Sequence, residues 1–220
     1  MNKFQHVILA APDIRLLAGK RDDFFQTIKR QESSYNLALN TLIVIRKGFL
    51  DDEKYKLEEN SKFFVIDRKT KGALATLGLC LDAILPNLPI LVSPFDGFIG
   101  ISENDFLSAM ESSSCDAGLV AFKSTNPRYS YVRMIQSEAI EIAEKSVISS
   151  LATSGTFYFK NKEILMNCIQ WTLLNRVTFN GDYYIAPSLN SLIMTGRKLK
   201  IFEIDENLYT RMELKTFKEE

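Results

Sequence analysis

The segment ILVSPFDGFI, residues 90–99, places a short buried strand directly before a turn that carries a carboxylate. Its first residues, Ile90 to Val92, form an apolar run that is too short for a helix, which favours a strand buried on both faces. Pro94 and the pair Asp96-Gly97 then end the strand, because both favour turns. The sequence therefore predicts a central strand with Asp96 at its carboxyl end.

The residues on either side of this segment continue the same alternation of strands and helices. Apolar runs predict buried strands at 6–11, 41–45 and 63–66, and helical patterns lie between them at 22–30, 51–60 and 73–85. This alternation is typical of a parallel sheet covered by helices. Beyond residue 100 we expect helices at 104–111 and 162–175, a loop and helix at 183–194, strands at 117–122, 129–134, 139–143 and 153–159, and an edge strand at 198–204.

These elements predict an α/β fold with a Rossmann-like, mostly parallel sheet flanked by helices. The chain has 220 residues with no repeat and no linker, which favours a single domain over 1–220. We divide it into a regular βαβ half, residues 1–100, and a mixed half, residues 101–220. Ligands of such sheets bind outside the carboxyl ends of the strands.

The charge balance narrows the range of partners. Lys and Arg number 27, and Asp and Glu also number 27, so the formal net charge is zero. This argues against a protein that binds nucleic-acid backbone, which needs a basic surplus. It also gives no reason to expect an anionic membrane surface as partner, and no apolar run approaches the ~20 residues of a membrane span. We expect a cytoplasmic protein.

Histidine and cysteine are scarce. His6 is the only histidine, which excludes multi-histidine metal sites, and its place in a predicted strand favours a structural role. Cys80, Cys115 and Cys168 are widely spaced, so we expect buried thiols in a reducing cytosol instead of a disulfide framework.

Two segments at carboxyl ends of strands suggest ligand chemistry. Asp96 suits Mg²⁺, which takes one or two carboxylates together with phosphate oxygens, although an Asp-Gly pair also commonly stabilises a turn. Lys69 to Gly72 open a helix, where backbone N–H groups and two lysines suit a phosphate or the edge of a nucleobase. A solvated loop with a helix cap is the alternative.

Several longer segments resemble the sugar-phosphate nucleotidyltransferases, the NDP-sugar pyrophosphorylases with a Rossmann-like core. The likeness is greatest to members from bacterial capsule and surface-polysaccharide gene clusters. The segments are DRKTKGALAT (67–76), ILVSPFDGFI (90–99), AGLVAFKSTNPRYSYVRM (117–134), EIAEKSVISSLATSGTFYFK (141–160) and NGDYYIAPSLNSLI (180–193). The resemblance covers roughly residues 40–205 and implies Mg²⁺-dependent transfer of a nucleotidyl group from an NTP to a phosphorylated acceptor, with release of pyrophosphate.

The resemblance also implies roles for individual residues on the acceptor side. Asp96 matches the aspartate that holds the catalytic Mg²⁺. Glu144 matches the residue that holds a sugar hydroxyl, and Lys145 matches the one that contacts the sugar phosphate. Gly155 matches a glycine in the strand that lines the acceptor pocket. Asn190 belongs to a segment that in many members supplies a second metal-binding aspartate, and we expect it to bind substrate.

The nucleotide side departs from the family pattern. Gly72 matches the glycine beside the nucleobase, and we expect Lys71 next to it to contact the nucleotide as well. The family's glycine-rich loop after the first strand is replaced by Pro12 to Arg21, with Gly19 as its one glycine. We therefore expect Ala11, Arg15 and Lys20 to contact the nucleotide, with Arg15 also acting in catalysis, and a solvated loop is the alternative. At the second metal position stands Pro187, and only Asp182 or Asn190 could take the place of the aspartate.

Three functions remain open. The first is nucleotidyl transfer to a sugar phosphate in surface-polysaccharide biosynthesis. The second is a catalytically degenerate relative that binds a nucleotide-sugar or scaffolds a partner enzyme, which the altered loop favours. The third, lower in rank, is a nucleotide-sugar-dependent glycosyltransferase, although the Asp-x-Asp motif of such enzymes is missing at Asp96-Gly97-Phe98. The apolar face of the helix around Trp171 suits core packing or a homodimer contact.

Overall fold

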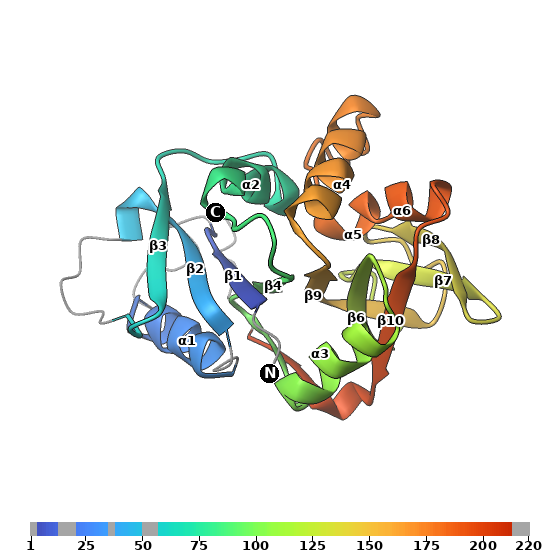
Figure 1. The fold of residues 1–220 in the computed structure, drawn as a ribbon, viewed down its shortest axis with the longest axis horizontal. Helices are drawn as coiled ribbons and strands as arrows, with labels where there is room; N and C mark the ends of the chain where they lie inside the picture. The colour runs from blue at the N-terminus through green and yellow to red at the C-terminus, as the bar shows by residue number, and fades with distance from the viewer. Residues whose placement is uncertain (1–3, 13–20, 35–37, 50–56, 213–220) are drawn as a thin grey trace, which may run out of the picture.

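The computed structural model describes residues 4–12, 21–34, 38–49 and 57–212. At its centre, nine strands of these residues form one sheet, whose main path follows the order β10-β6-β9-β4-β1-β2-β3 (Figure 1). The bounds are β1 Phe4–Ala10, β2 Ala38–Arg46, β3 Ser61–Ile66, β4 Ile90–Pro94, β6 Ala117–Lys123, β9 Leu151–Phe159 and β10 Leu199–Ile204. The pairs β1–β2, β1–β4, β2–β3 and β6–β10 are parallel. The predicted α/β class with a mostly parallel sheet is thereby confirmed.

Along this path β9 is the strand that runs against its neighbours. It pairs antiparallel with β4 over Phe157–Phe159 and with β6 over Leu151–Phe159. The register with β6 is irregular between Leu119 and Ala121, and Gly155 lies in the opposing stretch of β9 with φ +88°. A bulge of this kind bends a strand and redirects its side chains. The pairing of β9 with β4 begins only after this bulge, at Phe157, so the part of β9 before the bulge is separated from β4.

Strands β1, β4 and β6 are buried on both faces, which explains their continuous apolar sequences. Helix α2 (Ala73–Leu79), α4 (Lys162–Leu174), α5 (Ile185–Ser188) and α6 (Asn190–Met194) pack on one face. Helix α1 (Arg21–Ser34) and α3 (Glu103–Ser112) pack on the other face (Figure 1). In the described parts of the chain, no helix combines the length and apolar character needed to cross a membrane.

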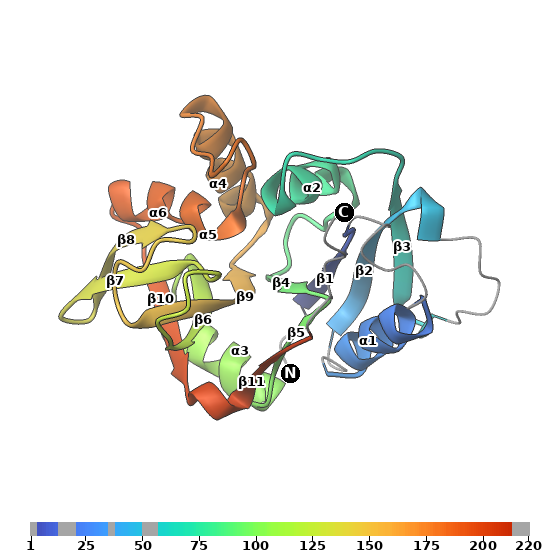
Figure 2. The same cartoon turned by 180° about the vertical axis from the view of Figure 1, so that it is seen from behind.

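A hairpin and a short C-terminal strand complete the second half. Strands β7 (Tyr131–Ile135) and β8 (Glu138–Ala143) pair with each other, and β7 also joins β9. After β10, which is an edge strand as predicted, the chain returns beneath the sheet (Figure 2). There β11 (Tyr209–Arg211) pairs antiparallel with β5 (Gly97–Ile99), directly after the turn at Asp96.

Residues of α1 hold the turn at the end of β4 in place. The Gln31 side chain is buried and donates hydrogen bonds to the carbonyls of Pro94, at 2.7 Å, and Gly97. The Arg30 guanidinium lies 4.2 Å from the centre of the Phe98 ring. A buried amide with satisfied hydrogen bonds fixes geometry as well as adding stability, so α1 holds the backbone on both sides of Asp96.

Two predicted helices differ from those observed. The helix expected over 73–85 ends at Leu79, and Cys80 is followed by a separate 3₁₀ turn over Leu81–Ala83. Gly78 weakens the end of the helix, and Ile84 is already extended ahead of Pro86. Most of the helix expected over 51–60 lies outside the described residues, and Leu57–Asn60 form no helix.

Substitution of Gly72 tests how closely the residue before α2 packs against the backbone of Tyr183. A Cβ atom at this position would lie 2.2 Å from the Tyr183 carbonyl oxygen, and φ is +91°. Gly181 has φ +81° but no atom within 4 Å of such a Cβ. We expect Gly181→Ala to cost about 1 kcal/mol of unfolding free energy, from backbone strain alone. Gly72→Ala should cost about 3 kcal/mol, because overpacking is added. Urea unfolding measures both losses of unfolding free energy, and equal losses would contradict close packing of Gly72 against Tyr183.

Candidate functional site

A cavity of about 500 Å³ opens where β4 and β9 diverge. Its floor is formed by the ends of β1 and β4 together with the bulged part of β9. Around it stand the residues before α2, the residues on either side of the β7–β8 hairpin, the start of α5 and strand β11. The charged side chains in the lining are Asp96, Arg128, Glu144, Lys145 and Arg211. The cavity lies at the carboxyl ends of β1 and β4, where the parallel sheet predicts a ligand.

Asp96 carries a nearly buried charge. Its side chain is 11% exposed, and Oδ2 accepts a hydrogen bond from Nε of Arg211 at 3.0 Å. Its carbonyl accepts a hydrogen bond from the Met212 backbone at 2.8 Å. A carboxylate buried without a partner would be costly, so the return of the C-terminal strand stabilises the turn that β4 leads into.

Glu144 lies deeper in the cavity than its neighbour Lys145. Burial raises the pKa of the Glu144 carboxyl, while the hydrogen bond from Ser130 Oγ to Oε2 and the charges of Lys145 and Arg211 act to lower it. The hydrogen bond from Ser130 holds the Glu144 carboxyl in place, and its oxygens can accept further hydrogen bonds.

Lys145 stands at the rim of the cavity among aromatic rings. Its Nζ donates to the Tyr184 hydroxyl at 3.1 Å and lies 4.8 Å and 5.4 Å from the ring centres of Tyr184 and Phe179. The backbone of Lys145 is left-handed, with φ +49°. Because the backbone turns at Lys145, directly after β8, the side chains of Glu144 and Lys145 lie at different depths in the cavity.

The cavity also brings together Ala11, Gly72 and Gly155 from the predicted set. Gly155 packs against Pro94, since a Cβ there would lie 3.2 Å from Pro94 Cγ. Ahead of α2, the hydroxyls of Thr70 and Thr76 are 2.5 Å apart, and Thr76 donates to the Gly72 carbonyl. The absent side chains of Gly72 and Gly155 thus allow the backbone of Tyr183 and the ring of Pro94 to pack closely beside the cavity.

Of the remaining residues of the predicted set, only Lys71 and Asn190 are described, and neither lines the cavity. Arg15 and Lys20 fall outside the described residues. The Lys71 side chain is exposed and does not line the cavity, and its carbonyl accepts a hydrogen bond from Tyr183. Asn190 does not line it either.

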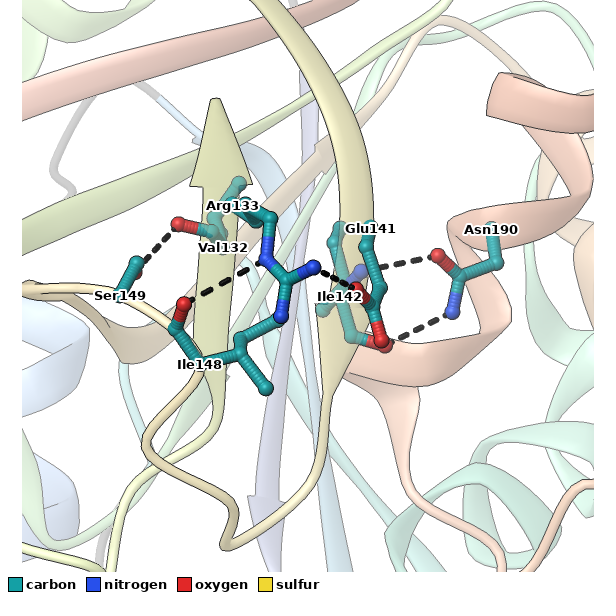
Figure 3. Close-up of polar contacts among 7 residues, drawn as sticks. All are labelled: Val132, Arg133, Glu141, Ile142, Ile148, Ser149 and Asn190. Carbon is teal, nitrogen blue, oxygen red and sulfur yellow. Dashed lines mark hydrogen bonds and ion pairs between the residues drawn. The ribbon is translucent and has the colours of Figure 1, made fainter. Parts of the chain in front are cut away.

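Asn190 instead binds the backbone of β8 (Figure 3). Its Oδ1 accepts from the Ile142 amide at 2.9 Å, and its Nδ2 donates to the Ile142 carbonyl at 2.8 Å. The side-chain amide therefore replaces a neighbouring strand at this edge. With both polar ends engaged in this way, Asn190 is not part of the site that the cavity defines.

Sequence reasoning missed the residues contributed by the C-terminal strand and by the segment before β7. Tyr209 and Arg211 come from β11, and Arg128, Tyr129 and Ser130 precede β7. The Tyr209 ring stacks on Phe122 at 4.4 Å, and Tyr129 meets both rings edge-on. A strand of three residues is too short to show periodicity, so β11 left no signal in the sequence. Tyr129 and Ser130 lie within the segment 117–134 that carries the family resemblance, and this was the one available indication of their role.

The single histidine lies away from the cavity. His6 is fully buried in β1, and its Nε2 is 2.7 Å from the Ser93 hydroxyl. Burial lowers its pKa to about 3, so the ring is neutral at physiological pH. The three cysteines are buried free thiols, and burial raises the pKa of Cys80 to about 12 and that of Cys168 to about 11. Neither residue type supplies a reactive group to the cavity.

The donor set fits a metal ion only in part. Among the described residues no group of three or more His, Cys, Asp or Glu side chains could hold one. Asp96 offers a single carboxylate, of which Oδ2 already binds Arg211, and Pro187, at the position that the resemblance assigns to a second acidic residue, is buried. A carboxylate has lone pairs for both partners, and Mg²⁺ often relies on substrate phosphates for its remaining ligands. The residues therefore fit Mg²⁺ that is held jointly with a phosphorylated ligand.

Comparison with known proteins shows similarity in structure but not in sequence. No protein-family model matches the chain, and no curated protein matches it. The fold is similar to that of a nucleoside-diphosphate-sugar pyrophosphorylase from Vibrio cholerae, with TM-score 0.74, 18% identity and coverage of 94% of both chains.

Two further solved structures are similar. One is a Bacillus anthracis protein assigned as a glucose-1-phosphate thymidylyltransferase, with TM-score 0.75, 16% identity and coverage of 94% of this chain and 89% of that one. The other is the inositol-1-phosphate CTP transferase from T. maritima, with TM-score 0.68, 16% identity and coverage of 96% and 90%. These likenesses establish a nucleotidyltransferase-type fold, as predicted.

The structural role of Asn190 can be tested by stability. Asn190→Ala removes two hydrogen bonds and leaves both backbone groups of the buried Ile142 unsatisfied, so we expect a loss of about 2 kcal/mol of unfolding free energy. Asn175→Ala is the matched control, because its amide donates one exposed hydrogen bond to the Trp171 carbonyl. That variant should lose less than about 0.5 kcal/mol. Two small and equal losses in urea would show that the Asn190 contacts do not stabilise β8.

The burial of His6 predicts a pH dependence of stability. In the unfolded state the ring takes up a proton near the ordinary histidine pKa of 6.5, and in the folded state only near about 3. Stability therefore rises with pH across that window and falls on acidification. Between pH 7.5 and pH 5 the wild-type protein should lose roughly 2 kcal/mol more than His6→Gln. Urea unfolding at both pH values measures the difference, and parallel losses would mean that His6 titrates normally.

Proposed function

We propose that this chain transfers a nucleotidyl group from an NTP to a phosphorylated acceptor and releases pyrophosphate. The observation that carries the proposal is the convergence of Gly72, Asp96, Glu144-Lys145 and Gly155 on one cavity. These residues come from separate segments of the chain, and each matches a functional position of the sugar-phosphate nucleotidyltransferases. The nucleotidyltransferase-type fold supports the same reading.

The reaction requires little covalent chemistry from the protein. An oxygen of the acceptor phosphate attacks the α-phosphorus of the NTP and forms a new P–O bond. The bond from the α-phosphorus to its bridging oxygen breaks, and pyrophosphate leaves with the electron pair. Such a displacement depends on holding the two phosphates in line and on neutralising their charge.

Each lining residue has a role in that arrangement. The backbone at Gly72 admits the nucleobase closely, and the end of β1 at Ala11 borders the nucleotide. Glu144 accepts a hydrogen bond from a hydroxyl of the acceptor, and Lys145 at the rim attracts its phosphate. Arg15 and Lys20, in the segment after β1, are proposed to contact the triphosphate.

Mg²⁺ is the proposed cofactor, with Asp96 as its ligand. When bound, it would neutralise charge on the phosphates. From the resemblance we further propose that the acceptor is a sugar phosphate and that the product serves surface-polysaccharide biosynthesis in the cytoplasm.

One observation favours a second candidate. The ion pair between Asp96 and Arg211 already neutralises the carboxylate proposed to hold the metal. A relative that only binds a nucleotide-sugar needs no metal at Asp96, so this ion pair is compatible with binding without turnover. Thermal unfolding separates the two, since a binding protein is stabilised by nucleotide-sugar while no pyrophosphate appears with any substrate pair.

The proposed activity is tested by pyrophosphate release with each NTP, Mg²⁺ and a panel of sugar phosphates. We expect at least one pair to react, and Asp96→Asn to lower the rate by about 10²- to 10³-fold, since a group aimed at transition-state charge is lost. Asp116→Asn is the control. Asp116 forms an ion pair with Arg197 at 3.5 Å before β6, outside the cavity, and its loss should leave the rate unchanged. Release that is insensitive to Asp96→Asn would contradict the assigned role.

A further inference from the structure

The C-terminal strand β11 contributes side chains to the cavity at alternate positions. Tyr209 and Arg211 both line it, whereas Thr210 between them does not. Alternate residues of a strand share one face, so the pairing of β11 with β5 sets the direction of both side chains. The last described strand of the chain is therefore part of the site.

Arg211 is held in the cavity through one edge of its guanidinium. Nε donates to Asp96 Oδ2 at 3.0 Å, and within the described residues neither Nη atom donates a hydrogen bond. The side chain is 39% exposed, whereas that of Asp96 is 11% exposed. Arginine presents its donors as a rigid fork, so the end formed by Nη1 and Nη2 can accept a second anion while Nε stays bound.

The charge of Arg211 acts on both carboxylates of the cavity. Burial acts to lower the pKa of Arg211, but Asp96 together with Tyr209 and Tyr129 outweighs this and raises it. The same guanidinium acts to lower the pKa of Glu144. Without Arg211, Asp96 and Glu144 would together repel a phosphate from the interior of the cavity.

The other cations of the cavity are placed differently. Lys145 is exposed at the rim, where its ammonium contacts Tyr184 and Phe179. Arg128 is also exposed, and its guanidinium lies 5.1 Å from the Tyr129 ring centre. The direction of Arg211 is fixed by a nearly buried carboxylate, that of Asp96.

We propose that Arg211 binds the phosphate of the phosphorylated acceptor through Nη1 and Nη2, and that Asp96 positions it for that contact. The inference rests on the proposed function for the identity of the ligand. It assigns the main phosphate contact to β11 and leaves Lys145 as a rim cation. Two parallel N–H···O bonds fix the orientation of a phosphate as well as its charge, which an in-line displacement needs.

Calorimetric titration with inorganic phosphate in EDTA tests this contact without metal and without turnover. The wild-type protein should bind phosphate, and Arg211→Gln should weaken binding by about ten- to a hundred-fold, the effect of losing hydrogen bonds from a charged donor. Arg211→Lys keeps the charge but cannot bind Asp96 and phosphate with one fork, so it should also weaken binding by about ten-fold. Because Arg211→Lys keeps the positive charge beside Asp96, weaker phosphate binding in this variant cannot be attributed to misfolding of Arg211→Gln.

Arg133→Gln is the matched control. Arg133 forms an ion pair with Glu141 at 3.2 Å on the β7–β8 hairpin, outside the cavity (Figure 3). It should bind phosphate as the wild type does. Absence of phosphate binding in the wild type, or unchanged affinity in both Arg211 variants, would overturn the proposal.

The outcome is separable from that of the proposed function. If no substrate pair releases pyrophosphate but the Arg211 variants lose phosphate affinity, the binding role holds and nucleotidyl transfer fails. If pyrophosphate is released, Arg211→Lys should raise KM for the acceptor by about ten-fold with KM for the NTP unchanged. Unchanged KM values for both substrates would reject Arg211 as the acceptor contact while the activity stands.

Discussion

The course of strand β9 determines where a ligand can bind. It is hydrogen-bonded to β4 over Phe157–Phe159 and to β6 along its length, so it joins the two halves of one sheet. At Gly155, with φ +88°, it bulges and separates from β4. A sheet that stayed paired would leave no room between these strands. The divergence instead exposes the end of β4 and the backbone of β9 to the same cavity.

The charge placed at that opening accounts for the route of the C-terminus. Asp96 follows a buried strand, and its carboxylate needs a partner because it is almost entirely removed from water. Strand β11 supplies Arg211 by pairing with β5, which begins one residue after Asp96. The same pairing aligns Tyr209 with Phe122 and closes one wall. One ion pair thus links the end of β4, the C-terminal strand and the electrostatics of the cavity.

Local patterns in the sequence were sufficient for most of the fold. The buried strands β1, β2 and β4 are continuous apolar runs, and the turn at Asp96 follows from proline and glycine chemistry. Arg211 could not be found in this way, because a three-residue strand has no period and its partner is over a hundred residues away. Asn190 shows the converse difficulty. An asparagine that binds substrate and one that binds a strand edge have the same sequence signal, and only the contacts with Ile142 separate them.

In the proposed binding mode, the cavity between β4 and β9 receives a phosphate at Arg211. A crystal structure of the full chain grown with a nucleoside triphosphate, Mg²⁺ and a sugar phosphate addresses it most directly. We predict ligand density in this cavity, with a phosphate oxygen within hydrogen-bond distance of Nη1 or Nη2 of Arg211 and the Nε contact to Asp96 retained. Ligand bound elsewhere on the protein, or bound in the cavity with its phosphates away from Arg211, would contradict it.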